Sequence, residues 1–118
     1  MKFKLIEKKE EIDGVYSFKF SPEEDINWKP GQYIRYTIDD LNHDEQGNNR
    51  FFSISSSPQE GFVMITTRID KIKSSTFKNY LLNLPLGDEI NGDPPTGSFV
   101  VEEESKNIIF VAGGIGIT

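Results

Sequence analysis

The sequence predicts an all-β domain, a six-stranded antiparallel Greek-key barrel with one short helix, followed by a C-terminal strand of a different kind. Three observations indicate this fold. Short apolar segments alternate with polar positions and are separated by turn residues, which is typical of antiparallel strands with one buried face. One segment has helical spacing, at residues 75–84. The last apolar run, at residues 107–112, does not alternate, which is typical of a parallel strand buried on both faces.

The predicted strands follow one another at short intervals. In the second of them Tyr16, Phe18 and Phe20 alternate with polar residues, and Asp13-Gly14 before it is a hairpin turn signal. The candidate strand segments, seven for about six expected strands, are residues 3–6, 15–20 and 33–39, the segment that begins at Arg50, and residues 62–69, 88–91 and 98–102. Short strands at regular spacing favour a closed antiparallel barrel.

A single helix is predicted between the fifth and sixth of these segments. Residues 74–76 offer hydroxyl side chains as N-caps, and Pro85 and Gly87 end the helix. Phe77, Leu81 and Leu84 share one face.

Composition excludes several classes of function. The 118 residues are enough for one domain with a core, and the net charge of -6 disfavours nucleic acids and anionic membranes as partners. The absence of cysteine excludes disulfides, thiol catalysis and a cysteine-ligated iron–sulfur cluster within this chain. No apolar run reaches membrane-spanning length, and the N-terminus lacks an apolar signal region, so we expect a soluble cytoplasmic protein.

Residues 39–49 form a polar, mostly acidic loop that carries the one histidine of the sequence, His43. A single histidine among acidic residues is a poor cage for a metal ion. The loop is therefore predicted to be a solvated connection rather than a metal or catalytic site.

The stretch from Arg50 to Pro58 carries the most specific chemistry. Side chains alternate along a strand, so Arg50 and Phe52 point the same way, while Ser53 points oppositely or turns at a bend. A guanidinium suits a pyrophosphate, a flat ring suits a flat heterocycle, and a hydroxyl suits a ring nitrogen. Two interpretations stay open on these residues alone: a nucleotide site, or an ordinary strand in which Arg50 pairs with a surface acid and Phe52 belongs to the core.

This stretch resembles the Arg-x-(Tyr/Phe)-Ser signature of the flavin-binding domain in the ferredoxin–NADP reductase family. Four more stretches resemble motifs of the same family and follow in order along the chain. They are Pro30-Gly31-Gln32-Tyr33, the helix start at Ser75–Leu81, the set Gly92, Pro95, Gly97 and Phe99, and Gly113-Gly114-Ile115-Gly116-Ile117-Thr118. Because five matches occur in sequence, the resemblance covers the whole chain.

The resemblance implies a role for each of these residues. Phe52 would stack on the isoalloxazine, the Ser53 hydroxyl would bond flavin N5, and Arg50 would neutralise the pyrophosphate, so Ser53 and Phe52 are the residues expected to be catalytic. The other implied cofactor contacts are Thr66, Thr67 and Arg68 on the next strand, Ser75, Thr76, Phe77 and Lys78 at the helix start, Gly97 near the isoalloxazine, and Gly113, Gly114, Gly116 and Thr118 in a loop for NAD(P).

The helix start departs from the family pattern. Many members have Gly at position 75 and Ser or Thr at position 78, where this chain has Ser75 and Lys78. Which hydroxyl contacts phosphate is therefore open, whereas the backbone amides and the charge of Lys78 favour an anion in either case. Plain helix capping is the alternative interpretation. Arg68 has a structural alternative too, as a solvated charge at a strand edge.

The resemblance implies a flavin-binding domain, cofactor FAD, at residues 1–106, and the first strand and glycine loop of an NAD(P)-binding domain at residues 107–118. Such enzymes move electrons between NAD(P)H, flavin and a carrier protein. With the rest of the second domain beyond Thr118, we expect no efficient NAD(P)H reductase activity from this chain by itself. The alternatives are FMN in place of FAD, a flavin-free small β-barrel that serves as a binding module, and a scaffold that no longer retains flavin.

The apolar strand expected at residues 108–112 would lack the sheet to which it belongs. An apolar strand with unpaired edges seeks another strand. We therefore expect this tail to be docked on its own barrel, or to pair with a second copy in a dimer.

Overall fold

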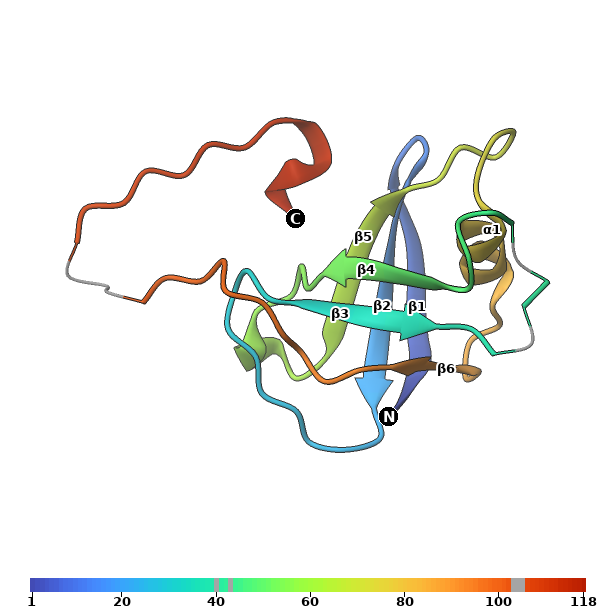
Figure 1. Cartoon of the computed structure of the whole chain (residues 1–118), viewed down its shortest axis with the longest axis horizontal. Coiled ribbons are helices and arrows are strands. Elements are labelled where there is room, and N and C mark those ends of the chain that lie inside the picture. Colours follow the sequence, from blue (N-terminus) through green and yellow to red (C-terminus); the bar gives the residue numbers. More distant parts are fainter. Residues whose placement is uncertain (40, 43, 103–105) are drawn as a thin grey trace.

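Six antiparallel strands form one sheet in the order β4-β3-β6-β1-β2-β5 (Figure 1). The computed structural model describes residues 1–39, 41–42, 44–102 and 106–118, so His43 and its predicted solvated position lie outside the described residues. The strands are β1 (Lys2–Ile12), β2 (Val15–Pro22), β3 (Tyr33–Thr37), β4 (Asn49–Ser53), β5 (Val63–Arg68) and β6 (Glu89–Gly92). The helix is α1 (Thr76–Asn83), and two short 3-10 helices are η1 (Pro58–Glu60) and η2 (Gly114–Ile117).

The two end strands of the sheet, β4 and β5, contact each other, which closes the sheet into a barrel. This confirms the predicted antiparallel barrel with one helix. β1 is longer than the segment predicted at residues 3–6, because residues 7–12 continue the ladder with β2 although most of them are charged and exposed. Two register shifts, between Leu5 and Glu7 and between Glu10 and Ile12, bend this long hairpin.

The core lies inside the barrel and is rich in aromatic rings. Tyr36 on β3 is at its centre, with ring centroids 5.2 Å from Phe3, 5.6 Å from Phe20 and 6.2 Å from Phe52. Phe52 in turn lies 6.0 Å from Phe77 of α1, so the core extends from the sheet to the helix. The other fully buried side chains include Leu5, Phe18, Ile34, Val63, Ile65, Ile69 and Leu81.

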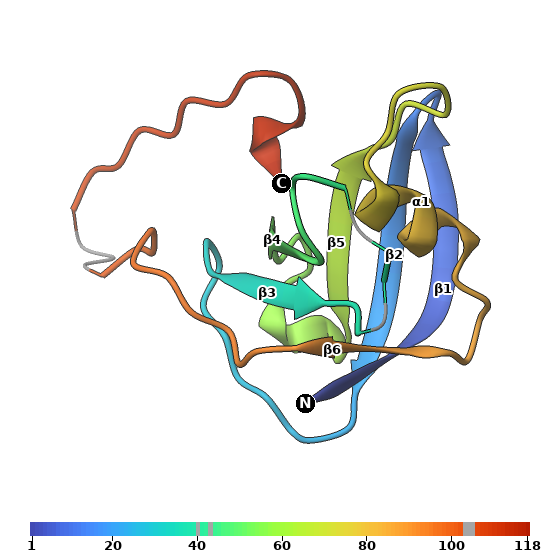
Figure 2. The ribbon, with the colours of Figure 1, turned by 45° about the vertical axis from the view of Figure 1, so that its right-hand side comes forward.

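Helix α1 begins as the sequence predicts and covers one opening of the barrel (Figure 2). Ser75 is the N-cap, and its side chain accepts a hydrogen bond from the Lys78 N–H. At the other end, Lys8 of β1 donates to the Leu84 carbonyl at 2.8 Å, which satisfies a carbonyl that the helix leaves open. No helix in the described ranges is long and apolar enough to cross a membrane.

Two predicted strands do not form. Residues 98–102 contain no strand; the chain there makes only an isolated bridge between Thr96 and Tyr33. It also passes so close to the turn before β3 that a Cβ at Gly31, which has a φ of +100°, would lie 1.7 Å from the Phe99 carbonyl oxygen. The Val100 N–H bonds locally to the Ser98 carbonyl at 2.9 Å rather than to a neighbouring strand.

The expected strand at residues 107–112 is also absent. Ile109 and Val111 are 90% and 94% exposed, and the segment runs out from the barrel (Figure 1). The prediction that the tail docks on its own barrel is therefore wrong. A strand needs a neighbour to satisfy its backbone, and residues 107–112 pair with no strand in the described structure. Pairing with a second copy stays a prediction.

Tyr36 provides a test of this core. Its hydroxyl is buried and has no hydrogen-bond partner among the described residues, and burial raises the pKa of this phenol. A buried hydroxyl without a partner costs free energy, so we expect Tyr36→Phe to keep or increase the free energy of unfolding, by up to ~1 kcal/mol. Urea denaturation measures this.

The matched control is Tyr16→Phe, because the Tyr16 hydroxyl bonds to Glu10. This control is expected to lose stability. A comparable loss in Tyr36→Phe would show that the Tyr36 hydroxyl does make a hydrogen bond in the folded protein.

Candidate functional site

The seam between β4 and β5 is where the barrel closes, and most of the predicted site residues lie along it. These two strands are the ends of the sheet and form no ladder with each other in the described structure. Their closest link is beyond the end of β4, where Ser55 N–H donates to the Met64 carbonyl at 2.8 Å. Helix α1 follows β5 in the chain and starts close to the same seam (Figure 2).

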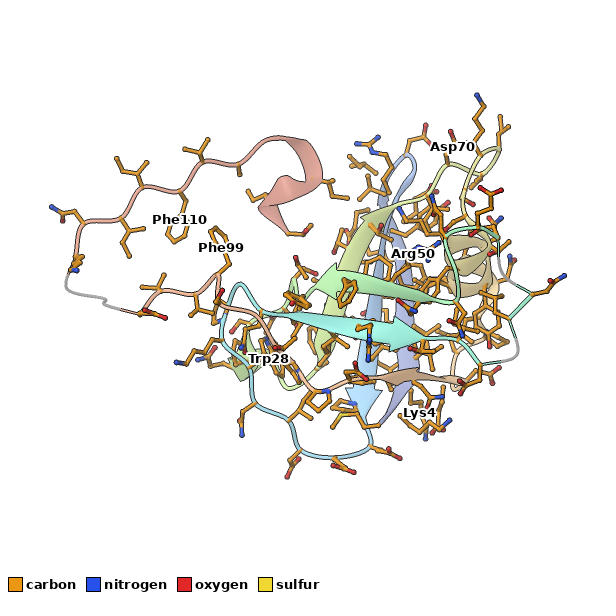
Figure 3. The ribbon with its side chains drawn as sticks, viewed as in Figure 1. Lys4, Trp28, Arg50, Asp70, Phe99 and Phe110 are labelled. Carbon is orange, nitrogen blue, oxygen red and sulfur yellow. The ribbon has the colours of Figure 1, made fainter. Side chains whose placement is uncertain are left out.

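Arg50, on β4, points toward α1 and is held by the loop that precedes its own strand (Figure 3). Its Nη1 donates to the carbonyls of Gln46 at 2.8 Å, Gly47 at 3.2 Å and Asn49 at 2.6 Å. Its Nη2 lies 3.7 Å from a carboxylate oxygen of Asp44. The guanidinium is thus fixed in place and its side chain is only 18% exposed.

Phe77 connects Arg50 to the helix. The guanidinium carbon lies 5.6 Å from the centroid of the Phe77 ring, a cation–π arrangement that orients the charge over the first turn of α1. Phe77 itself is fully buried. The predicted pyrophosphate residue and the predicted helix start are therefore brought together, whereas the Phe77 side chain belongs to the core.

The N-terminus of α1 already holds a negative charge. An Asp44 oxygen accepts the Thr76 N–H at 3.0 Å, and the Thr76 hydroxyl accepts the Asp44 N–H at 3.2 Å. The hydrogen bond from Thr76, followed by one from the Gln46 N–H and by the charge of Arg50, holds the pKa of the Asp44 carboxyl below its usual range. A carboxylate is therefore bound where a helix N-terminus and an arginine favour an anion.

Lys78 adds a second cation to this place. Its Nζ donates to the Arg68 carbonyl at 2.7 Å, which connects the first turn of α1 to the end of β5. Partial burial, and then the charge of Arg50, lower the pKa of Lys78. Because the charge of Arg50 disfavours the charged form of Lys78, a bound anion would relieve this repulsion. The Arg68 side chain, in contrast, is exposed.

The two threonines on β5 differ in role. The Thr66 hydroxyl bonds to Ser17 at 2.8 Å and to Ser55 at 3.1 Å, so it connects β2, β5 and the end of β4. Thr67 is buried. The Thr66 hydroxyl is thus used within the barrel, and the implied contacts of Thr66 and Thr67 with a cofactor stay a prediction.

The two faces of β4 separate the predicted catalytic residues. Phe52 is 8% exposed and lies in the core, on the same side as Arg50. Ser53 faces outward together with Phe51, which is 60% exposed. The structure therefore does not bring Phe52 and Ser53 to one surface.

Gly97 lies against the exposed side of β3. A Cβ on Gly97, which has a φ of +122°, would lie 2.9 Å from the ring of Tyr33. The Gly97 carbonyl accepts a hydrogen bond from the Gln32 side chain at 3.2 Å. Gly97 therefore lets the 96–97 turn pack closely on Tyr33, and its implied place near the isoalloxazine stays a prediction.

The glycine loop is not part of this cluster. Gly113, Gly114, Gly116 and Thr118 lie on the exposed tail, where residues 114–117 form η2 with local hydrogen bonds from Gly116 to Gly113 and from Thr118 to Ile115. Their proposed contact with NAD(P) stays a prediction.

Sequence reasoning missed Asp44 at this site, and it did not decide which of Phe51 and Phe52 is buried. Asp44 is in the loop that was interpreted as a solvated connection, and no local pattern indicates that it reaches a helix 32 residues later. For Phe51, the adjacent Phe52 gives the strand an aromatic ring on each face, so alternation alone does not decide which ring is buried.

The first turn of α1 fits a phosphate group. The Asp44 carboxylate stands in for such an anion, because it accepts a backbone N–H of the helix and lies beside Arg50. Lys78 supplies further positive charge at the same turn. An anionic ligand that replaces the carboxylate would meet these same donors.

The charge of Asp44 is expected to stabilise the fold. A carboxyl whose pKa is lowered in the folded state contributes stability above its unfolded pKa and loses it as the pH falls through the folded pKa. We therefore expect Asp44→Asn to lower the Tm at neutral pH, and the difference from the unchanged protein to shrink as the pH falls through that range. Thermal unfolding followed by circular dichroism measures this.

Glu45→Gln, at an exposed acid in the same loop, controls for the change in net charge. A Tm difference for Asp44→Asn that keeps its full size at low pH would show that the negative charge of Asp44 does not hold the helix.

Comparisons with known proteins agree with this geometry. No model of a protein family matches the sequence. A flavohemoprotein of Halalkalibacterium halodurans is 32% identical over 124 residues, which covers 97% of this chain and 30% of that protein. The chain thus spans about a third of the length of the curated relatives that it matches.

Solved structures share the fold over most of the chain. Phthalate dioxygenase reductase, described as a modular structure for electron transfer from pyridine nucleotides to [2Fe-2S], superposes with a TM-score of 0.80 at 21% identity, over 100% of this chain and 36% of that one. A ferredoxin NADP+ reductase from Neisseria gonorrhoeae, with bound FAD and NADP, has a TM-score of 0.66 at 19% identity, over 83% of this chain and 38% of that one. By its barrel fold and its homology to flavohemoproteins, this chain belongs to the ferredoxin–NADP reductase family.

Proposed function

We propose that residues 1–106 are the flavin-binding domain of an oxidoreductase that moves electrons between a nicotinamide, FAD and an electron carrier. The observation that carries this proposal is the anion site at the first turn of α1, where Arg50 and Lys78 lie beside a helix amide that already binds a carboxylate. The relatives support it, since a flavohemoprotein and a reductase with bound FAD resemble this chain.

The residues of this chain bind and orient the cofactor. Arg50 and Lys78 neutralise its phosphates, and the N-terminal amides of α1 donate hydrogen bonds to them. Ser53 presents an exposed hydroxyl to the flavin ring, and the backbone at Thr66–Arg68 borders the same seam. The flavin, when bound, supplies the capacity to accept and pass on one or two electrons.

Cofactor entry requires a rearrangement of the loop before β4. Asp44 occupies the helix N-terminus, and the guanidinium of Arg50 donates to the carbonyls of Gln46, Gly47 and Asn49. A phosphate replaces the Asp44 carboxylate at these donors. Since FAD and FMN both carry a phosphate, either cofactor uses the same residues, and chromatography of the released cofactor distinguishes them.

We assign residues 107–118 to the start of a nucleotide-binding domain that would hold the nicotinamide. Exposed apolar side chains at Ile109, Phe110 and Val111 support this assignment, since such residues are typical of a strand that is covered by other elements. Reduction by NAD(P)H then depends on residues outside the barrel, and the electron carrier is a separate domain or protein.

The first test is the visible absorption spectrum of the purified protein, before and after addition of FAD or FMN. We expect flavin bands that stay with the protein after gel filtration. Arg50→Ala is expected to weaken binding roughly tenfold, because a charge-assisted hydrogen bond to phosphate is lost. Titration with each flavin gives the Kd.

Arg35→Ala is the matched control, since Arg35 is an exposed arginine on β3 that pairs with Asp93 at 2.7 Å away from α1. It is expected to leave the Kd unchanged, and Arg50→Lys is expected to fall between the two. A colourless protein that binds neither flavin, while its circular dichroism shows a folded barrel, would contradict the proposed function and favour a flavin-free binding module.

A further inference from the structure

One short segment contacts both groups that a phosphate would use at the first turn of α1. We call residues 44–49, which lead into β4, the strap; they lie beside this turn (Figure 2). At one end of the strap, an Asp44 carboxylate oxygen accepts the Thr76 N–H at 3.0 Å, and the Asp44 N–H donates to the Thr76 hydroxyl at 3.2 Å. This reciprocal pair holds the strap against the helix.

The rest of the strap surrounds the guanidinium of Arg50. Nη1 donates to the carbonyls of Gln46, Gly47 and Asn49, and Nη2 donates to the side-chain oxygen of Gln46 at 2.9 Å. Four of the five N–H groups of a guanidinium lie on these two nitrogens. The end of Arg50 that would bind a phosphate is therefore engaged by the same segment that covers the helix amide.

The strap has a fixed end and a position at which it can turn. Asn48 is tied to Ile38 at the end of β3, through hydrogen bonds of 3.0 and 3.2 Å. Gly47, immediately before Asn48, has a φ of +80° and open space where a Cβ would stand, so its backbone can change without a steric penalty. Movement at Gly47 would release Asp44 and Gln46 together while β3 and β4 stay paired.

Asp44 and a phosphate would compete for one place. Each is an anion that accepts the Thr76 N–H and lies beside Arg50, and two anions at the same donors repel each other. Without a ligand, the cations Arg50 and Lys78 favour an anion at this turn, and Asp44 supplies it from within the chain. A closed site lowers the apparent affinity for a ligand by the fraction of molecules that are open.

We propose that the strap is an intramolecular competitor of the cofactor: with Asp44 on Thr76 it closes the anion site, and a flavin phosphate binds after the strap opens. This inference rests on the proposed flavin-binding function and adds a control of cofactor affinity at the same site. Asp44 then has two opposite effects, because the closed strap stabilises the protein without cofactor and lowers its affinity for the cofactor.

The test removes the charge of Asp44 and keeps its size. Asp44→Asn is expected to tighten the Kd for FAD roughly three- to tenfold, the factor for a strap that is open in about a tenth to a third of the molecules. Its Tm without cofactor is expected to fall. A residue that only supports the helix would have the opposite effect on binding, because its replacement would weaken the affinity for FAD.

Glu45→Gln is the matched control, since Glu45 is the next residue, is exposed and loses the same charge. This control accounts for the general attraction of an anionic cofactor to a less acidic protein. Because solvent and salt screen an exposed charge, the Kd is expected to stay within about twofold of that of the unchanged protein.

Binding rates give a second readout, measured by the change in flavin fluorescence after rapid mixing. If opening precedes binding, Asp44→Asn raises the association rate constant by the same factor as the affinity and leaves the dissociation rate constant unchanged. A slower dissociation with an unchanged association would show that Asp44 acts in the cofactor-bound form, which would contradict the competitor role.

The outcomes separate this inference from the function on which it rests. If the unchanged protein binds FAD, and Asp44→Asn binds it equally well or more weakly, the inference is wrong and the flavin-binding function stands. Where neither FAD nor FMN binds, the proposed function fails and inorganic pyrophosphate becomes the probe. A larger rise of the Tm with pyrophosphate in Asp44→Asn than in the unchanged protein and Glu45→Gln would then support the strap, and an equal rise would overturn it.

Discussion

The packing of Phe52 between Tyr36 and Phe77 is the contact on which the rest of the site depends. It joins β3, β4 and α1 in one core, with centroid distances of 6.2 and 6.0 Å. Because side chains alternate along a strand, burial of Phe52 places Arg50 on the side of α1 and turns Phe51 and Ser53 outward. One core contact therefore decides which groups are available to a ligand on each face of β4.

The charges at the first turn of α1 are balanced within the chain. Arg50 and Lys78 lie close enough for the pKa of Lys78 to be lowered, first by burial and then by Arg50. The Asp44 carboxylate offsets this repulsion and also caps the helix at Thr76. A phosphate that binds here would therefore take the place of the Asp44 carboxylate. The site can thus hold Arg50 and Lys78 close together, in an acidic protein, both with and without a ligand.

The barrel buries its apolar side chains, whereas the C-terminal tail leaves its apolar side chains exposed. The barrel encloses a continuous core from β1 to α1, to which the residues after 106 add no buried side chain. In the tail, apolar side chains such as Val111 remain 94% exposed. A strand forms only where a neighbouring strand bonds its backbone N–H and C=O groups. An apolar composition like that of β5 therefore forms no strand in the tail.

The sequence by itself determined the barrel and a helix capped by a hydroxyl among residues 74–76, because these follow from local alternation, turn residues and capping chemistry. That Arg50 and the helix start serve one anion was implied by the family resemblance. The sequence did not determine which of Phe51 and Phe52 is buried, since both faces of β4 carry the same ring. Pairing of Phe52 with Ile34 in the β3–β4 ladder decided that. Nor did it place Asp44 at Thr76 or leave residues 98–102 without a strand. Contacts between distant parts of the chain form only when the barrel closes, and local patterns carry no information about them.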